Sequence, residues 1–377
     1  MSAPRLDIDE VLDTAKILVC CGSGGVGKTT TAAALAVRAA ERGRRTVVLT
    51  IDPAKRLAQS MGLSELDNVP RAVVGVDGKL DAMMLDMKRT FDEIVEAHAQ
   101  PGKAAVILAN PFYIALSTSF AGTQEYMAME KLGQLRATRR WDLIIVDTPP
   151  TRSALDFLDA PQRMTALLDG RMVRILLAPA KASGKAYLKV VTAGLNVFTG
   201  AITRIIGASV LQDVSQFVAA LETLFGGFRE RAQTTYDLLK APGTMFVVVA
   251  TPERDALREA AYFVERLGEE SMPLAGLVVN RVHRSGAASL SAKRSEAAAE
   301  QLEEAGSAPL AAAVLRLHAD RVALAAREVR LQERFTTAHP GVAVVEVAAQ
   351  PGDVHDLAGL RAVGADLAGG RAAAVPG

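Results

Sequence analysis

Cysteine is scarce in this chain of 377 residues, and the two that it has, Cys20 and Cys21, are neighbours inside one apolar run. Side chains alternate between the two faces of a strand, so these thiols can neither form a comfortable disulfide nor converge on a metal ion. We therefore expect two buried, reduced thiols. The scarcity also excludes a disulfide framework and a cluster held by cysteines on loops.

An excess of charge is missing as well. The chain carries 43 Lys and Arg side chains against 42 Asp and Glu side chains. It therefore has neither a basic surface for nucleic acid nor a polybasic anchor for anionic lipid. The first ten residues are polar and acidic and lack the apolar stretch of a secretory signal. From these absences we expect a cytoplasmic protein that binds no nucleic acid and makes no stable insertion into a membrane.

Half of the residues are hydrophobic, and many of them form runs of strand length that are separated by helical stretches. This alternation predicts the α/β class, with a doubly wound, mostly parallel sheet. The chain is long enough to bury a large core, as one elaborated domain or two closely joined ones. After the first run at Ile17–Cys21, the others lie at residues 46–51, 80–87, 141–147, 244–250, 274–280 and 342–347.

The most specific motif directly follows the first run. Residues 22–29 read G-S-G-G-V-G-K-T and match the Walker A pattern G-x-x-x-x-G-K-[ST] of a P-loop, between an expected strand and an expected helix at 30–42. Backbone N–H groups and the helix dipole would face phosphate oxygens, Lys28 would reach the outer phosphates and Thr29 would ligate Mg²⁺. The predicted ATP-binding residues here are Gly22, Ser23, Gly24, Gly25, Val26, Gly27, Lys28, Thr29 and Thr30.

Two aspartates follow other expected strands. Asp147 ends the run at 141–147 and is followed by a proline-stiffened loop, an arrangement that holds an Mg²⁺-bound water beside the γ-phosphate. Asp52 follows the run at 46–51, at the edge of the sheet where ligands of open α/β folds bind. It could orient or deprotonate the attacking water, as the catalytic residue. Its alternative role is to cap a short helix at 55–61.

At these residues the chain resembles the arsenical-pump and tail-anchored-protein-targeting ATPase family, an ArsA-like branch of the P-loop NTPases that works as nucleotide-sandwiching dimers. The family's deviant Walker A motif, G-K-G-G-V-G-K-T-T, corresponds to residues 22–30, and its two switch motifs, D-P-A-H and D-T-A-P-T-G-H, correspond to 52–55 and 147–153. Its P-G-x-x-E motif is similar to 121–125. The resemblance also implies that Glu253 contacts the nucleotide and that Asn280 reads the adenine, for which an amide offers both a donor and an acceptor.

The chain departs from the family pattern at several positions. Ser23 replaces the signature lysine that reaches the partner's phosphates across the dimer, so a homodimer should hydrolyse ATP slowly. Lys55, Arg152 and Ser153 replace switch residues, and Arg152 could substitute in part for the missing cation. No C-x-x-C motif is present, so we expect ATP and Mg²⁺ but no zinc. The histidines lack metal-ligand spacing and are interpreted as structural or surface residues: His98, His283, His318, His339 and His355.

Between residues 159 and 240 the alternation of strands and helices stops. We predict the first part of an NTPase core at 1–158, a helical subdomain at 159–241, the second part of the core at 242–368 and a disordered tail at 369–377. Within the subdomain, 190–212 is apolar with Arg204 as its only charge, but its polar and glycine residues argue against a membrane span. The subdomain is either an ordinary buried bundle or, as the resemblance implies, a groove for a client's hydrophobic helix.

The resemblance and the motifs together lead us to expect a dimeric ATPase that couples its nucleotide state to conformational change in membrane-protein handling. A non-enzymatic alternative remains open, in which the chain is a weakly active or inactive, nucleotide-locked regulatory subunit of a heterodimer with a paralogue that keeps the lysine. A second alternative is the ATPase subunit of an anion pump.

Overall fold

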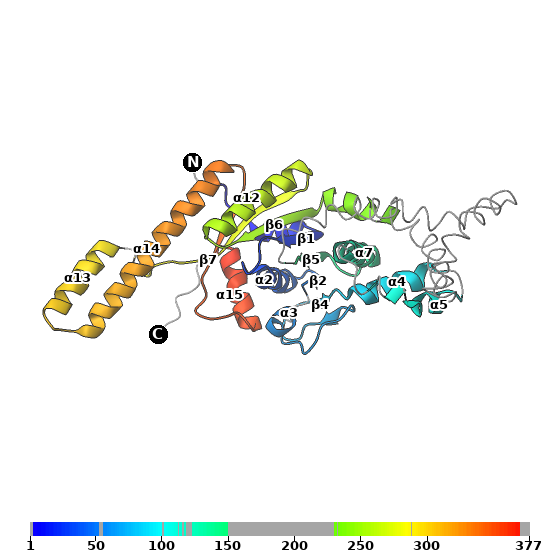
Figure 1. The fold of residues 1–377 in the computed structure, drawn as a ribbon, viewed down its shortest axis with the longest axis horizontal. Coiled ribbons are helices and arrows are strands. Elements are labelled where there is room, and N and C mark those ends of the chain that lie inside the picture. Colours follow the sequence, from blue (N-terminus) through cyan, green and yellow to red (C-terminus); the bar gives the residue numbers. More distant parts are fainter. Residues whose placement is uncertain are drawn as a thin grey trace, which may run out of the picture. The chain divides into compact units, whose positions relative to one another are not determined.

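The computed structural model describes residues 3–52, 56–99, 102–111, 113–114, 117, 123–149, 230–231, 233–287 and 289–369 (Figure 1). The chain divides into two compact units. The first comprises Met1–Met84, Thr138–Leu155 and Leu239–Gly377, and the second Leu85–Ala137 and Asp156–Leu238. Most of the predicted helical subdomain at 159–241, including 190–212, lies outside the described residues, as does the tail at 370–377, so these assignments remain predictions.

The first unit is built on one eight-stranded sheet, which confirms the predicted fold class (Figure 1). Every strand pair is parallel except β3–β4, which is antiparallel at one edge. In sheet order the strands are β3 (Arg71–Ala72), β4 (Leu80–Met84), β2 (Thr46–Thr50), β5 (Leu143–Asp147), β1 (Ile17–Cys21), β6 (Thr244–Ala250), β7 (Leu274–Val282) and β8 (Val344–Ala348). The central position of β1 places the loop that follows it in the middle of the carboxyl edge of the sheet.

In a parallel sheet the crossover connections cover both faces, so a strand that is buried on both sides needs a continuous apolar run. Every residue of β1, β2 and β5 is buried in this way. Several element boundaries differ by one to three residues from the sequence prediction, most of all at the strand expected at 80–87. That strand ends at Met84, because Met87 already belongs to the next helix, α4 (Met87–His98). Asp86 caps that helix, and its side chain accepts a hydrogen bond of 2.8 Å from the backbone N–H of Arg89.

Helices α2 (Lys28–Glu41) and α15 (Leu357–Leu367) pack together over one face of the sheet, and α12 (Arg254–Glu269) packs against β6 and β7. Small residues permit the close contact of α2 with α15: a Cβ added at Gly364 would lie 3.4 Å from the carbonyl oxygen of Ala34. Cys20 belongs to the apolar core that these elements share. Both cysteines are free and buried, as predicted, and burial raises the pKa of Cys21 to about 12.

The remaining helices of the first unit are α1 (Ile8–Thr14), α3 (Arg56–Ser60), α13 (Ala292–Glu304) and α14 (Pro309–Ala338). The last two lie side by side as a helical hairpin (Figure 1). Helix α13 is polar, with Ser295 and Ala299 as its buried residues. No helix in the described ranges combines enough length and hydrophobicity to cross a membrane.

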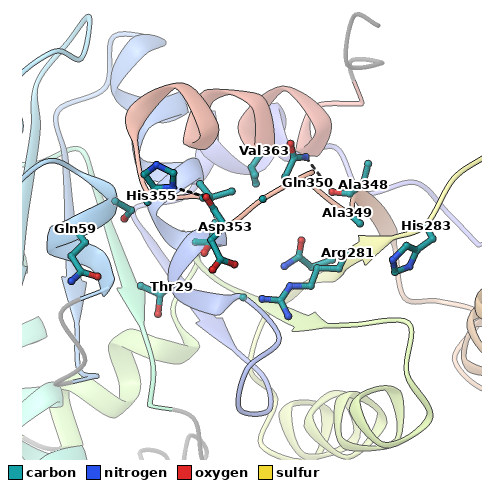
Figure 2. Close-up of a pocket in the computed structure, with 16 residues that line it drawn as sticks. Thr29, Gln59, Arg281, His283, Ala348, Ala349, Gln350, Asp353, His355 and Val363 are labelled. Atoms are coloured by element: carbon teal, nitrogen blue, oxygen red, sulfur yellow. Dashed lines mark hydrogen bonds between the residues drawn. The ribbon is translucent and has the colours of Figure 1, made fainter. Parts of the chain in front are cut away.

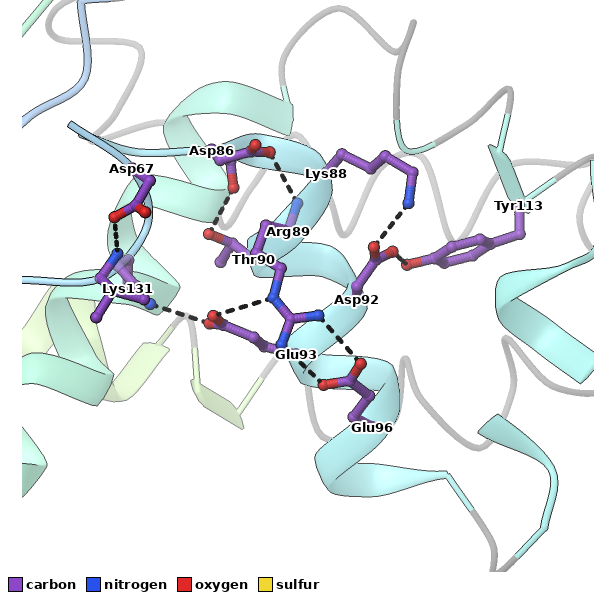
Figure 3. A network of polar contacts seen from close by, with 11 residues as sticks. Asp67, Asp86, Lys88, Arg89, Thr90, Asp92, Glu93, Glu96, Tyr113 and Lys131 are labelled. Atoms are coloured by element: carbon purple, nitrogen blue, oxygen red, sulfur yellow. Dashed lines mark hydrogen bonds and ion pairs between the residues drawn. The ribbon is translucent and has the colours of Figure 1, made fainter. Parts of the chain in front are cut away.

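The described helices of the second unit, α4, α5 (Ala104–Leu108) and α7 (Thr123–Thr138), carry a network of polar contacts (Figure 3). Lys131 of α7, almost fully buried, donates to Glu93 of α4 at 3.0 Å. The hydroxyl of Tyr113 donates to Asp92 at 2.7 Å. Because a buried charge without its partner would be costly, the pair of Lys131 and Glu93 favours one register of α4 against α7.

Candidate functional site

The loop between β1 and α2 lies in close contact with its surroundings at two glycines. Gly22 has a φ of +148°, and a Cβ there would lie 2.1 Å from the carbonyl oxygen of Val249 in β6. Gly27 has a φ of +94° and is the N-cap of α2, where a Cβ would lie 2.2 Å from Nδ2 of Asn280. Only glycine fits at either position. The loop can therefore follow the edge of the sheet closely and present its backbone N–H groups to a ligand.

Lys28 is the first residue of α2, and its side chain turns back over the loop. Its Nζ donates to the carbonyl oxygen of Ser23 at 2.8 Å, and the residue is only 5% exposed. Burial lowers the pKa of Lys28, an effect opposed chiefly by the carboxylate of Asp147. An ammonium held in this way lies across the loop whose N–H groups would cradle phosphate, and phosphate oxygens would offer it stronger partners than one carbonyl oxygen.

Asp147 lies at the end of β5, fully buried beside the start of α2. One of its oxygens, Oδ2, accepts hydrogen bonds from the hydroxyls of Thr29 at 2.7 Å and Thr50 at 2.9 Å. The other, Oδ1, is buried and has no hydrogen-bond partner among the described residues. Burial raises the pKa of Asp147 to about 6, against the opposing effects of the two threonine hydroxyls and Lys28.

This geometry fits Mg²⁺. A hard divalent cation takes oxygen ligands, directly or through its water shell. The hydroxyl of Thr29 and the unpartnered Oδ1 of Asp147 are such oxygens on neighbouring groups. A cation nearby would also remove the electrostatic cost of an ionised carboxylate in this buried position. Among the described residues there is no group of three His, Cys, Asp or Glu side chains that could hold a metal ion by themselves.

Asp147→Asn should stabilise the nucleotide-free protein while weakening Mg²⁺-dependent ATP binding. The pKa of about 6 lies above the ordinary value of 3.8, so the folded chain holds this proton more tightly than the unfolded chain does. Stability is therefore lost as pH rises through the interval from about 4 to 6. The neutral amide should raise the free energy of unfolding by up to about 3 kcal/mol at pH 7.5 and by less at pH 4.5, as measured by urea unfolding. Equal gains at both pH values would contradict this account.

Asp52 follows Ile51 just beyond the end of β2 and is half-buried at the same edge of the sheet. Its backbone N–H donates to the hydroxyl of Thr50 at 3.2 Å, and the N–H of Ile51 donates to the carbonyl oxygen of Asp147 at 3.0 Å. Asp52 is close enough to contribute to the electrostatic field at both Lys28 and Asp147. Residues 53–55 lie outside the described ranges, so its alternative role as a helix cap has no structural test here.

Asn280 lies near the end of β7 and is 8% exposed. Its Nδ2 donates to the carbonyl oxygen of Val26 at 2.8 Å, which connects β7 to the phosphate-binding loop. Asn280 also lines a pocket of about 880 Å³ that extends from Thr29 and Thr30 to the segment after β8 (Figure 2). A pocket of this volume has room for a small-molecule ligand.

Other predicted site residues are not brought into this pocket. Glu253 is the N-cap of α12 at the end of β6; it is exposed, makes no side-chain capping bond and does not line the pocket. Ser23 is half-buried, and only its backbone oxygen takes part in the contacts around Lys28. Residues 150–153 and 121–122, which belong to the second switch and to the P-G-x-x-E-like motif, lie outside the described ranges.

Sequence reasoning missed several polar residues of the pocket. Arg281 follows Asn280 on β7, and His283 comes directly after that strand. Gln350, Asp353 and His355 come from the segment after β8. No local pattern in that segment assigns its side chains to a site. His283 also has a structural role, as predicted for the histidines: Glu328 accepts bonds from its backbone N–H at 2.8 Å and contacts its Nδ1 at 2.6 Å.

Comparisons with known proteins agree with this geometry. The family model of anion-transporting ATPases matches residues 15–308. An ATPase GET3 of Malassezia globosa is 31% identical over 158 residues, which cover 41% of this chain and 45% of that protein. An ATPase ASNA1 homolog of Cryptosporidium parvum is 27% identical over 272 residues, 72% of this chain and 66% of that protein. An ATPase GET3B of Arabidopsis thaliana is 25% identical over 283 residues, which cover 69% of this chain and 62% of that protein.

These matches confirm the resemblance that the motifs indicated, and the names of the relatives agree with the prediction of an ATP hydrolase. The chain spans less than two thirds of the length of each of these three relatives.

Proposed function

We propose, on the premise that this chain belongs to the anion-transporting ATPase family, that it binds Mg²⁺ and ATP at the loop between β1 and α2 and hydrolyses the ATP. One observation carries the proposal. Thr29 and Asp147 lie in hydrogen-bond contact at the start of α2, with a buried carboxylate oxygen that has no partner among the described residues. Lys28 lies across the same loop. A triphosphate with its Mg²⁺ would give each of these groups an electrostatic partner.

Each residue then has a separate task. The loop N–H groups and Lys28 bind the outer phosphates and stabilise the negative charge that develops on them during transfer. Mg²⁺ supplies further charge neutralisation, and Thr29 and Asp147 would hold it, Asp147 through a water molecule. Asp52, at the neighbouring strand end, orients or deprotonates the attacking water. Asn280 and Glu253 contact the nucleotide, and Asn280 contacts its base.

The protein is proposed to work as a dimer in which nucleotide state controls conformation. Catalysis in the family that the chain resembles uses a lysine that crosses the dimer interface, and Ser23 occupies that position here. The resemblance to ATPases that target tail-anchored proteins supports a cytoplasmic role in membrane-protein handling, with a client's hydrophobic helix as the ligand of the predicted helical subdomain. An apolar helix peptide with a photo-crosslinker should label residues 159–241 in an ATP-dependent way; labelling that ignores nucleotide would contradict the coupling.

Ser23 also favours a second function, in which the chain binds ATP without useful turnover and regulates a lysine-bearing paralogue. The two hypotheses differ in the fate of bound ATP, which is cleaved in the first and retained in the second. They also differ on mixing: a regulatory subunit changes the turnover of its partner while its own site stays occupied. The anion-pump alternative requires an anion to stimulate turnover, and the chain lacks the cysteines that would capture arsenite as thiolates.

Asp52→Asn should slow ATP hydrolysis about 100-fold or more while the Kd for ATP changes less than about threefold. The carboxylate is proposed to act on the water nucleophile, so its charge matters in the transition state more than in the bound ground state. Phosphate release and calorimetry measure the two quantities. Asp13→Asn is the matched control, since Asp13 lies on α1 and pairs with Arg42 at the surface. Parallel losses of binding and turnover would make Asp52 a binding or structural residue.

A further inference from the structure

β7 contains a bulge where it lines the pocket. Val279 is in register with Glu346 of β8, and the next pair joins Val282 to Ala348. Three steps along β7 therefore match two along β8, which is the signature of one inserted residue. Side chains of a regular strand point alternately to opposite faces. Asn280 and Arg281 are consecutive and nevertheless both line the pocket, because the bulge redirects one of them (Figure 2).

Arg281 carries the unusual backbone conformation of this bulge. Its φ is +62°, in the left-handed region that non-glycine residues rarely adopt and that costs free energy. His283, two residues further along, fixes this conformation of the backbone. Glu328 of α14 contacts both the backbone N–H and Nδ1 of His283, at 2.8 and 2.6 Å. Strained conformations that neighbouring contacts enforce are concentrated at functional sites.

Among the described residues, the guanidinium of Arg281 has no partner whose contact could offset the free-energy cost of this backbone conformation. Within the ranges that the structure describes, it makes no hydrogen bond or ion pair, and the residue is exposed to the pocket. Figure 2 shows it pointing into the pocket, toward the side on which Thr29 lies. The same side is formed by Gly27 and Thr30, at the start of α2.

We propose that Arg281 binds the α-phosphate of the nucleotide, an inference that rests on the proposed function of this site. Lys28 and Thr29 account for the outer phosphates and the Mg²⁺, which leaves the inner phosphate at the end of the pocket where Arg281 lies. A guanidinium has only donors, in a planar fork that matches phosphate oxygens. The amide of Asn280, next to it, already donates to the carbonyl oxygen of Val26.

The first test compares ligands that contain or lack the α-phosphate. Arg281→Ala should weaken the binding of ATP, ADP and AMP about tenfold, and should leave adenosine binding unchanged. Calorimetry measures the nucleotides, and saturation-transfer NMR at millimolar concentration measures adenosine. Arg281→Lys should recover part of the lost affinity, because lysine keeps the positive charge but lacks the planar, two-pronged donor group of the guanidinium. An equal loss for adenosine would place the contact on the base or ribose, and no loss for any ligand would remove Arg281 from the site.

The second test separates binding from structure. Arg281→Gly removes the cation but also relieves the left-handed backbone, so Tm should rise by about 1–3 °C while ADP affinity falls as in the alanine variant. Wild-type affinity in the glycine variant would overturn the proposal. The control is Arg284→Ala, because Arg284 lies three residues away and faces Glu346 at 3.5 Å outside the pocket. If Lys28→Ala abolishes ATP binding and Arg281→Ala does not weaken it, only this inference fails; if wild-type protein binds no nucleotide, the proposed function fails as well.

Discussion

Lys28→Ala should abolish ATP binding, with a loss of affinity greater than about 100-fold, while the protein remains folded. The ammonium of Lys28 turns onto the phosphate-binding loop, where it donates a hydrogen bond to the carbonyl oxygen of Ser23. Burial already lowers the pKa of Lys28, so the charged lysine carries a desolvation cost in the ligand-free protein. Removing it therefore takes away the main cation for the phosphates without removing a strong structural contact.

Calorimetric titration with ATP in Mg²⁺ buffer measures this loss, and circular dichroism with thermal melting verifies the fold. Lys79→Ala is the matched control, because Lys79 is an exposed lysine immediately before β4. It should bind ATP as the wild type does. Unchanged affinity in Lys28→Ala would show that the loop between β1 and α2 is not the nucleotide site.

Ser23→Lys should raise ATP turnover at least about tenfold, since cations that reach transferring phosphates from a partner contribute on the order of 10³ to 10⁵ in rate. The new ammonium would lie across the dimer interface against phosphate oxygens, where little water screens it. The backbone oxygen of Ser23, not its side chain, accepts the bond from Lys28, so the substitution leaves that contact in place. Phosphate release at saturating ATP measures the effect.

A paralogue that carries the lysine provides the companion experiment. If the chain works in a heterodimer, wild-type protein should bind ATP tightly, turn it over slowly alone and change its rate on mixing. We expect the mixing effect to be the larger of the two, because Lys55 and Ser153 also depart from the family's switches and one substitution does not restore them. No gain from either experiment would contradict the importance of the missing cation and would leave Arg152 as the candidate local cation.

Much of the fold was predictable because its signals are local. The strands β1 and β6 have the bounds that their apolar runs indicate, since a strand buried on both faces needs an unbroken apolar run. The P-loop motif likewise needs only consecutive residues, and α2 begins within it, at Lys28. The largest boundary difference is at the strand expected at 80–87, which ends at Met84 because Asp86 caps α4 and Met87 already belongs to that helix.

The rest of the site depends on contacts between distant segments. The contact of Thr50 with Asp147 requires β2 and β5 to be neighbours, which no local pattern specifies. The bulge that redirects Arg281 arises from pairing with β8, and an isolated sequence of valines and polar residues does not encode that register. Asn280 was assigned only through the family resemblance, because its contact with Val26 joins residues that are 254 positions apart in the sequence.

The fate of a single bound ATP tests the account most directly. Wild-type protein in excess over ATP, with Mg²⁺ present, should convert essentially all bound ATP to ADP and phosphate over minutes, and it should convert none in EDTA or with Lys28→Ala in place of the wild type. Chromatographic separation of the nucleotides after acid quenching measures the conversion. ATP that stays bound but is recovered intact would contradict hydrolysis by this chain and would make it the nucleotide-locked regulatory subunit.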